Sequence, residues 1–147
     1  MTALGAAGAR QIRNLQGSCL GSYPVKTSSV IYQGGLVNID VNGRASAATA
    51  VGAQRCIGVG EENATGNTAG TVYCSVRWGH EALFATATAL TTSFVTANVV
   101  VKDDNTVQTA ASYTTAVKVF VGEYVQKSGT SAWIAIRRFA DHAGIAV

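Results

Sequence analysis

Apolar and polar residues alternate over several short segments of this chain, which is the pattern of β-strands. The clearest segment runs from Thr71 to Trp78. Its even-numbered residues form an apolar face and its odd-numbered residues form a more polar face, as in a strand that packs one side on a core. The apolar face consists of Val72, Cys74, Val76 and Trp78.

Turn residues separate the other predicted strands at nearly regular intervals. Asn42-Gly43 is the strongest hairpin signal, because both positions of its preferred turn need a positive φ, and Asp103–Asn105 predicts a second turn. Short strands at this spacing predict an all-β fold, a small barrel or sandwich of antiparallel strands. The remaining strands are expected at residues 36–41, 55–59, 98–102, 106–109, 116–126 and 132–138. We expect the core to include Val72, Val76, Trp78, Val119 and Trp133.

The two halves of this β-region resemble each other. Residues 36–49 align with residues 99–112, which places Asp40 on Asp103 and Asn42 on Asn105. Val-Gly-Glu recurs at 59–61 and 121–123, and residues 71–77 compare with 131–137. Coincidence in a chain of biased composition is the alternative to an internal duplication. A duplicated unit whose halves pack face to face would leave few strand edges exposed.

The ends of the chain lack this pattern. Residues 1–22 have small side chains, several glycines and little periodicity, with Ile12 and Leu15 on one side of a short turn of helix at most. We expect an N-terminal arm at 1–22 that becomes ordered against a partner, a β-domain at 23–138 and a C-terminal tail at 139–147. The arm carries no acidic residue, and its candidate contact residues are Arg10, Ile12, Arg13 and Leu15.

The composition points to a surface that is covered by other protein. Hydrophobic residues make up 48% of the 147 residues, but charged residues make up only 13%, about half the usual share of soluble domains. An obligate oligomer or a lattice would cover such a surface. A net charge of +3 without a basic stripe is too weak for a dedicated nucleic-acid binder. No signal peptide and no membrane-spanning helix are expected, since no apolar run approaches about 18 residues.

The residues that could carry out chemistry are few and scattered. Most carboxylates fall in predicted turns, His80 is expected at a turn between strands, and His142 lies in the tail. Cys56 and Cys74 are expected to be small buried hydrophobes. No group of three or four close ligands suggests zinc, and Gly58-Val59-Gly60 matches only the first half of a phosphate-binding glycine motif. We therefore expect a protein that is not an enzyme and needs no metal or cofactor.

The order of these motifs resembles the capsid cement, or head decoration, proteins of tailed bacteriophages. The resemblance runs from about Tyr23 to Ile136 and consists of strand ends and turns rather than invariant catalytic residues. The basic arm and the tail beyond Phe139 depart from the simplest members. The similar segments are Tyr32–Asp40, Ile57–Glu62, Thr71–Gly79, Val99–Asp104 and Val119–Ile136.

The resemblance implies a structural virion protein on the outer surface of a phage capsid. Such a protein clamps neighbouring major capsid subunits and stabilises the head, and it is present in the host cytoplasm during assembly. Its implied partners are the major capsid protein and its own copies, with a trimer favoured over a dimer. Neither nucleic acid nor a membrane is expected as a partner.

Two other functions compete with this interpretation. A viral fibre or receptor-recognition β-module would show long loops with exposed aromatic residues, whereas the aromatic residues here fall mostly in predicted strands. A small enzyme or ligand-binding barrel would need polar residues on its inward faces. Those faces are apolar here, at Val72, Val76, Val117, Val119 and Val121.

Overall fold

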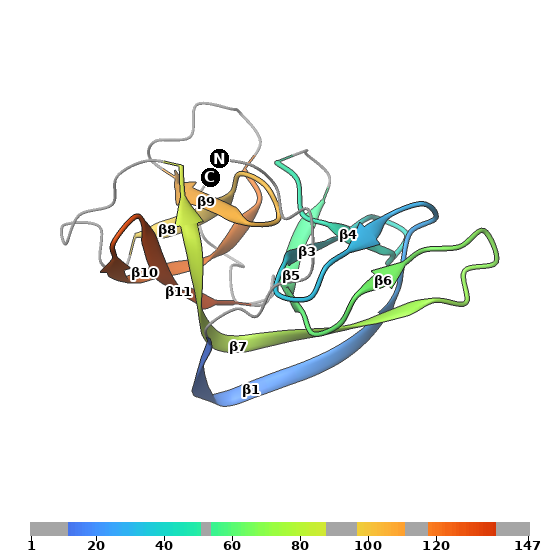
Figure 1. Ribbon diagram of the computed structural model, residues 1–147, viewed down its shortest axis with the longest axis horizontal. Helices are drawn as coiled ribbons and strands as arrows, with labels where there is room; N and C mark the ends of the chain where they lie inside the picture. The colour runs from blue at the N-terminus through green and yellow to red at the C-terminus, as the bar shows by residue number, and fades with distance from the viewer. Residues whose placement is uncertain (1–11, 51–53, 88–96, 111–117, 138–147) are drawn as a thin grey trace.

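The computed structural model describes residues 12–50, 54–87, 97–110 and 118–137, with the side chains of β1 from Cys19 onward. The chain is all-β, as its alternating pattern predicts, and no α-helix occurs in the described ranges (Figure 1). The strands are β1 (Ile12–Pro24), β2 (Val30–Ile31), β3 (Leu36–Ile39), β4 (Ala45–Ala47), β5 (Arg55–Gly60), β6 (Ala64–Thr65), β7 (Tyr73–Thr86), β8 (Asn98–Val101), β9 (Thr106–Thr109), β10 (Phe120–Ser128) and β11 (Ser131–Ile136).

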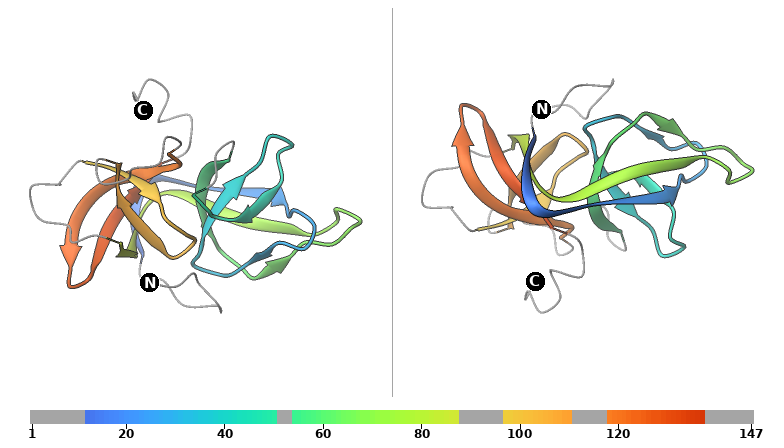
Figure 2. Two further views of the ribbon diagram at one scale, coloured as in Figure 1. Left: turned by 90° about the horizontal axis from the view of Figure 1, so that it is seen from above. Right: turned by 90° about the horizontal axis from the view of Figure 1, so that it is seen from below.

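The strands close into two barrels that share β7. In the second barrel, β7 pairs with β11, β11 with β10, β10 with β8, β8 with β9, and β9 returns to β7 in parallel. The first barrel follows the order β1-β7-β5-β3-β4. It closes where Val25 forms a parallel bridge with Ala45 and Lys26 N donates to Ala45 O at 2.8 Å. Figure 2 shows the two barrels side by side, with the short pair β2-β6 on the first.

Two apolar cores fill the structure, and β3 and β5 form a wall between them. Leu36 faces the second core and Val37 the first; Cys56 likewise faces the second core and Ile57 the first. Successive side chains of a strand point to opposite faces, so both faces of this wall are buried. This explains why both strands read as apolar runs rather than as alternating segments.

Strand β7 continues past the point where its sequence predicts a turn. The expectation that the strand ends at Trp78, with a turn at Gly79–Glu81, is wrong. Gly79 instead takes φ 75° within the strand, a conformation that glycine adopts without steric cost, and β7 bends there between the barrels (Figure 1). Opposite the bend, the register of β1 shifts between Asn14 and Cys19.

The contacts within the two barrels match the internal repeat. Gly60 pairs with Val76 in the first barrel, and the aligned Gly122 pairs with Ile136 in the second. The repeated glutamate and arginine form an ion pair in each half, Glu61–Arg77 at 2.8 Å and Glu123–Arg137 at 3.4 Å. The repeated aspartates bind the same backbone group: Asp40 Oδ1 accepts from Asn42 N and Asp103 Oδ1 from Asn105 N, both at 2.9 Å.

Half of the expected N-terminal arm belongs to the fold. Residues 12–22 lie in β1, which pairs with β7 of the same chain, so they are neither helical nor dependent on another molecule for a partner. Residues 1–11 and the expected tail at 139–147 lie outside the described residues. Within the Asp40–Arg44 turn, Gly43 has φ 75° but Asn42 does not have a positive φ, so the hairpin forms with a different turn from the one expected.

Candidate interaction surface

The core candidates occupy three different environments. Val76 and Val119 are buried, the first in the first core and the second in the second core. Val72 is partly buried against the first core and Trp78 against the second. Trp133 is only half-buried, which differs from the expectation, because its neighbours Ala132 and Ile134 take the inward positions of β11.

The largest exposed apolar side chains within β-strands gather on the outside of the first barrel. Leu20 is 59% exposed on β1, and Tyr73 is 56% exposed on β7. Figure 2 (right) shows these two strands in front of the rest of the first barrel. The outward residues are in register, with Leu20 opposite Arg77, Ser22 opposite Ser75 and Pro24 opposite Tyr73. We call these six residues the ribbon face.

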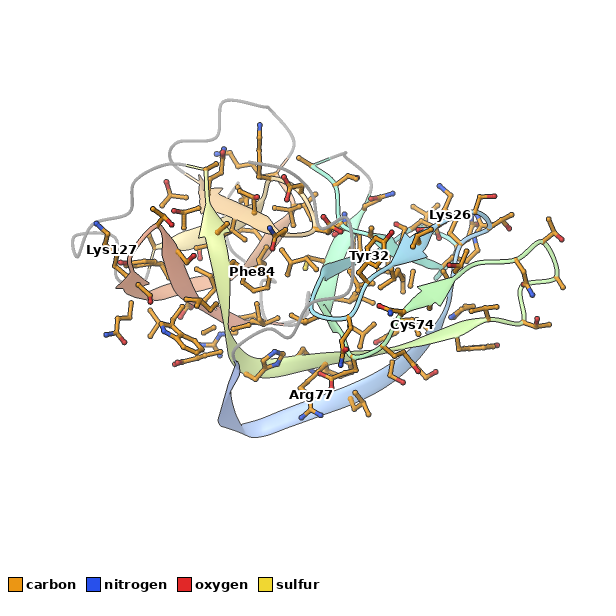
Figure 3. All side chains as sticks on the ribbon, viewed as in Figure 1. Lys26, Tyr32, Cys74, Arg77, Phe84 and Lys127 are labelled. Atoms are coloured by element: carbon orange, nitrogen blue, oxygen red, sulfur yellow. The ribbon has the colours of Figure 1, made fainter. Side chains whose placement is uncertain are left out.

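The other side of the same ribbon packs on the first core. Cys74 and Val76 are fully buried there, and Tyr23 is partly buried against them. Figure 3 shows Cys74 on the inner side of the ribbon and Arg77 on its outer side. The ribbon face is therefore the solvent side of a strand pair that the core holds in place.

Short-range electrostatics fix the polar part of the ribbon face. Arg77 Nε donates to Glu61 Oε1 at 2.8 Å, so the positive charge of this surface is locally paired. Ser75 N donates to Glu62 Oε1 at 2.9 Å, and this hydrogen bond lowers the pKa of Glu62. The face therefore presents Leu20 beside the paired Arg77 at one end, Pro24 and Tyr73 at the other end, and the two serines between them.

Two turns present further exposed groups on rigid backbones. Val41 is 83% exposed at the tip of the β3-β4 hairpin, where Asp40 Oδ1 also accepts from Arg44 N at 3.0 Å. The backbone N–H of Arg44 and the arginine charge lower the pKa of Asp40. At the β1-β2 turn, Ser28 adopts φ 61°, an uncommon value for a residue with a side chain, and donates its N–H to Gly66 O at 3.1 Å.

Cys56, Cys74 and His80 lie in buried environments that disfavour their charged forms. Burial raises the pKa of Cys56 to about 12 and that of Cys74 to about 11, which keeps both thiols protonated and unreactive. His80 is fully buried, and burial and the nearby Arg77 lower its pKa, so the ring is neutral. Among the described residues, no cluster of three or more potential metal ligands occurs.

The candidate contact residues of the arm are only partly described. Arg10 lies outside the described residues. Ile12 and Arg13 stand opposite Ala82 and Glu81 in the β1-β7 register, and Leu15 falls in the register shift that follows Asn14. The structure therefore does not bring these four residues together as one described side-chain cluster.

Two features of this region had a signal in the sequence that the prediction did not use. The alternation of β7 continues beyond Gly79 through His80, Ala82 and Phe84, all buried, and this continuation predicts the longer strand. The edge strand β1 had a weaker signal, because Gln16-Gly17-Ser18 interrupts any alternation between Ile12 and Leu20.

Comparison with known proteins adds no family assignment. No protein-family model matches the chain, and no curated protein matches it. Within the described ranges, no helix has the length and hydrophobicity needed to cross a membrane.

Proposed function

We propose that this chain is a structural virion protein that binds the outer surface of a phage capsid and clamps neighbouring major capsid subunits. The observation that carries the proposal is the ribbon face: Leu20 and Tyr73 are more than half exposed on a strand pair held by a packed core. Large apolar side chains on a strand pair that a core holds in place are suited to a protein partner. The order of motifs, which resembles cement proteins, supports the choice of partner.

The proposed partners are the major capsid protein and further copies of the chain. Low charge over the whole sequence supports self-association, because the buried centres of interfaces are poor in charged residues. The preference for a trimer over a dimer rests on the resemblance alone. The proposed location is the outer capsid surface of the virion, with the host cytoplasm as the site of the protein before assembly.

Co-sedimentation with capsids that lack this protein tests the proposal. The wild-type chain should sediment with the capsids and saturate them, and cryo-EM of the particles should place its density outside the shell. A Leu20→Ser/Tyr73→Ser double variant should bind at least tenfold more weakly, since two exposed anchors are removed from the interface. Val30→Ser, which alters an exposed apolar residue of β2, is the matched control. Equal binding by wild type and double variant would exclude the ribbon face as the contact.

A viral fibre or receptor-recognition module is the second candidate function. One observation favours it: Val41 is 83% exposed at the tip of a hairpin whose turn is fixed by Asp40. Rigid loop tips with exposed apolar groups are common in recognition proteins. Wild-type protein that binds host cells but not capsids would favour this function over the first.

A further inference from the structure

Strand β1 has one edge that points away from its partner strand. Residues of an antiparallel pair alternate between those bonded to the partner and those whose N–H and C=O groups point outward. Val25 N donates to Val72 O at 2.8 Å, which fixes the phase of this alternation. Tyr23 and Gly21 therefore bond to β7, while the backbone groups of Leu20, Ser22 and Pro24 point outward.

A hydrogen bond on the β5 edge of β7 agrees with this alternation of inward and outward backbone groups. Glu61 N donates to Ser75 O at 2.9 Å, so the odd-numbered residues of β7 bond toward the β5 side. The even-numbered residues of β7 then face β1, as the bond from Val25 to Val72 requires.

Along residues 20–24, no other described strand pairs with the outward edge. In the described part of the chain, β4 covers this side from Val25 and Lys26 onward, where it closes the first barrel. Two of the features that usually block edge pairing are missing from this stretch: residues 19–24 carry no charge, and their register with β7 contains no bulge. Pro24 marks the end of the usable stretch, because proline has no N–H to donate.

We propose that this edge pairs with the same edge of a second copy, antiparallel, with the two Ser22 residues opposite each other on a two-fold axis. This inference rests on the self-association in the proposed function and names its interface. Each Ser22 would donate its N–H to the Ser22 carbonyl of the other copy. Each Leu20 N–H would donate to the opposite Pro24 carbonyl, and the missing N–H of Pro24 would end the ladder.

The side chains in this register fit a second copy. On the outer face, exposed Leu20 meets Pro24 of the other copy, which places an apolar group against an apolar group. On the inner face, Gly21 meets Tyr23, so a residue without a side chain stands opposite an aromatic ring. No like charges face each other across the axis, because the stretch is uncharged in both copies. The ribbon faces of the two copies would join into one continuous surface.

The pairing is isologous, so it produces a dimer rather than the trimer that the resemblance implies. A ladder this short makes a modest contact. Such contacts act together when many copies are held side by side on a shell.

Opposite charges at Ser22 test the interface. Ser22 is exposed and its N–H points outward, so Ser22→Lys and Ser22→Glu should leave the β-fold intact by circular dichroism. By sedimentation equilibrium at about 100 μM, the wild type should have twice the 15.1 kDa chain mass, and each variant alone should have the single-chain mass. An equimolar mixture of the two variants should recover the dimer. Ser128→Lys, at the exposed end of the β10-β11 hairpin, should remain dimeric.

A disulfide at the two-fold axis provides a second test. Bonded residues that face each other in an antiparallel pair have Cα atoms about 5.5 Å apart, which is the usual Cα separation of a disulfide. In a Cys19→Ser background, Ser22→Cys should form a covalent dimer on mild oxidation, and Ser128→Cys should not. Cys56 and Cys74 are buried and should not interfere.

The outcomes separate this inference from the proposed function. An oligomer whose mass is unchanged in both Ser22→Lys and Ser22→Glu would overturn the edge interface, and so would a monomeric wild type. Capsid binding by a monomeric wild type would still support the proposed function. A wild type that dimerises through Ser22 but never binds capsids would support the interface and overturn the capsid function.

Discussion

The two barrels have the same order of strand pairing, but they differ at the strand that closes each barrel, β1 in the first and β7 in the second. The two closing strands differ in how much of each is paired with neighbouring strands. In the second barrel, β7 has β11 on one side, and β1 and β9 cover parts of its other side at residues 80–82 and 85–86. In the first barrel, β1 has β7 on one side, and among the described residues its other side meets only the bridge at Val25, just after the strand. The two similar halves thus differ, because one closing strand is protected and the other is open, and the open strand supplies half of the ribbon face.

The cores differ in a related way. The second core contains fifteen buried residues, whereas the first core has eight. Three of the fifteen, Leu36, Cys56 and Val59, come from the wall strands. Figure 3 shows Phe84 within the second barrel, on the part of β7 beyond the bend. Because the wall of β3 and β5 contributes to both cores, we expect the barrels to unfold together.

Phe84→Ala should have the largest effect on stability. Phe84 is fully buried in the second core, and truncation of such a side chain costs about 3–5 kcal/mol of unfolding free energy. Chemical denaturation followed by both tryptophan fluorescence and circular dichroism should show one shifted transition. Leu20→Ala, at an exposed position, is the control and should change stability by less than about 0.5 kcal/mol. Two separate transitions in the Phe84 variant would show that the wall does not couple the barrels.

Gly79→Ala should have the next largest effect on stability, because Gly79 lies at the bend of β7 between the two barrels. A residue with a Cβ at φ 75° costs roughly 1–2 kcal/mol relative to glycine. Urea denaturation should measure this loss. Gly129→Ala, at φ 59° in the β10-β11 hairpin, carries the same backbone cost away from the bend. If capsid binding also requires a fixed angle between the barrels, only the Gly79 variant should lose it.

The sequence predicts the all-β class and both hairpins, since each depends on local turn chemistry or on alternation. The sequence predicts a turn where β7 bends, because a glycine gives the same local signal in both. Strand β1 differs from its prediction for another reason. Its pairing depends on β7, about sixty residues away in the chain, and its own residues show no alternation. The exposure of Leu20 follows from that long-range pairing, so the sequence alone could not identify the ribbon face.

Acidification should weaken the fold through His80, which lies next to the bend. Its pKa is lowered by burial and by the charge of Arg77, which outweigh the opposing effects of Glu61 and of the Trp78 backbone. Below the usual histidine pKa of about 6.5, the unfolded chain binds a proton that the folded chain does not, so stability falls as the pH drops. His80→Leu should reduce this loss between about pH 7.5 and 5.5, measured by denaturation midpoints at both values. An equal loss in wild type and variant would contradict this role of His80, because the lowered pKa values of Asp40 and Glu62 reduce stability only below about pH 5.

The smallest expected effect is a difference in coupling free energy between the two repeated ion pairs. In the Glu61–Arg77 pair of the first barrel, the side chains are 31% and 30% exposed and the nearest atoms are 2.8 Å apart. The Glu123–Arg137 pair of the second barrel is 40% and 47% exposed at 3.4 Å, so water screens it more. Exposed pairs contribute about 0–1 kcal/mol, and we expect Glu61→Gln to fall in the upper half of that range and Glu123→Gln in the lower half. Double-mutant cycles with Arg77→Gln and Arg137→Gln measure each coupling without the other contacts of the residues.

Addition of salt to about 1 M should reduce both couplings, because it shortens the screening length to about 3 Å. A stronger coupling for Glu123–Arg137 would show that the repeated pair is better formed in the second barrel than its geometry indicates.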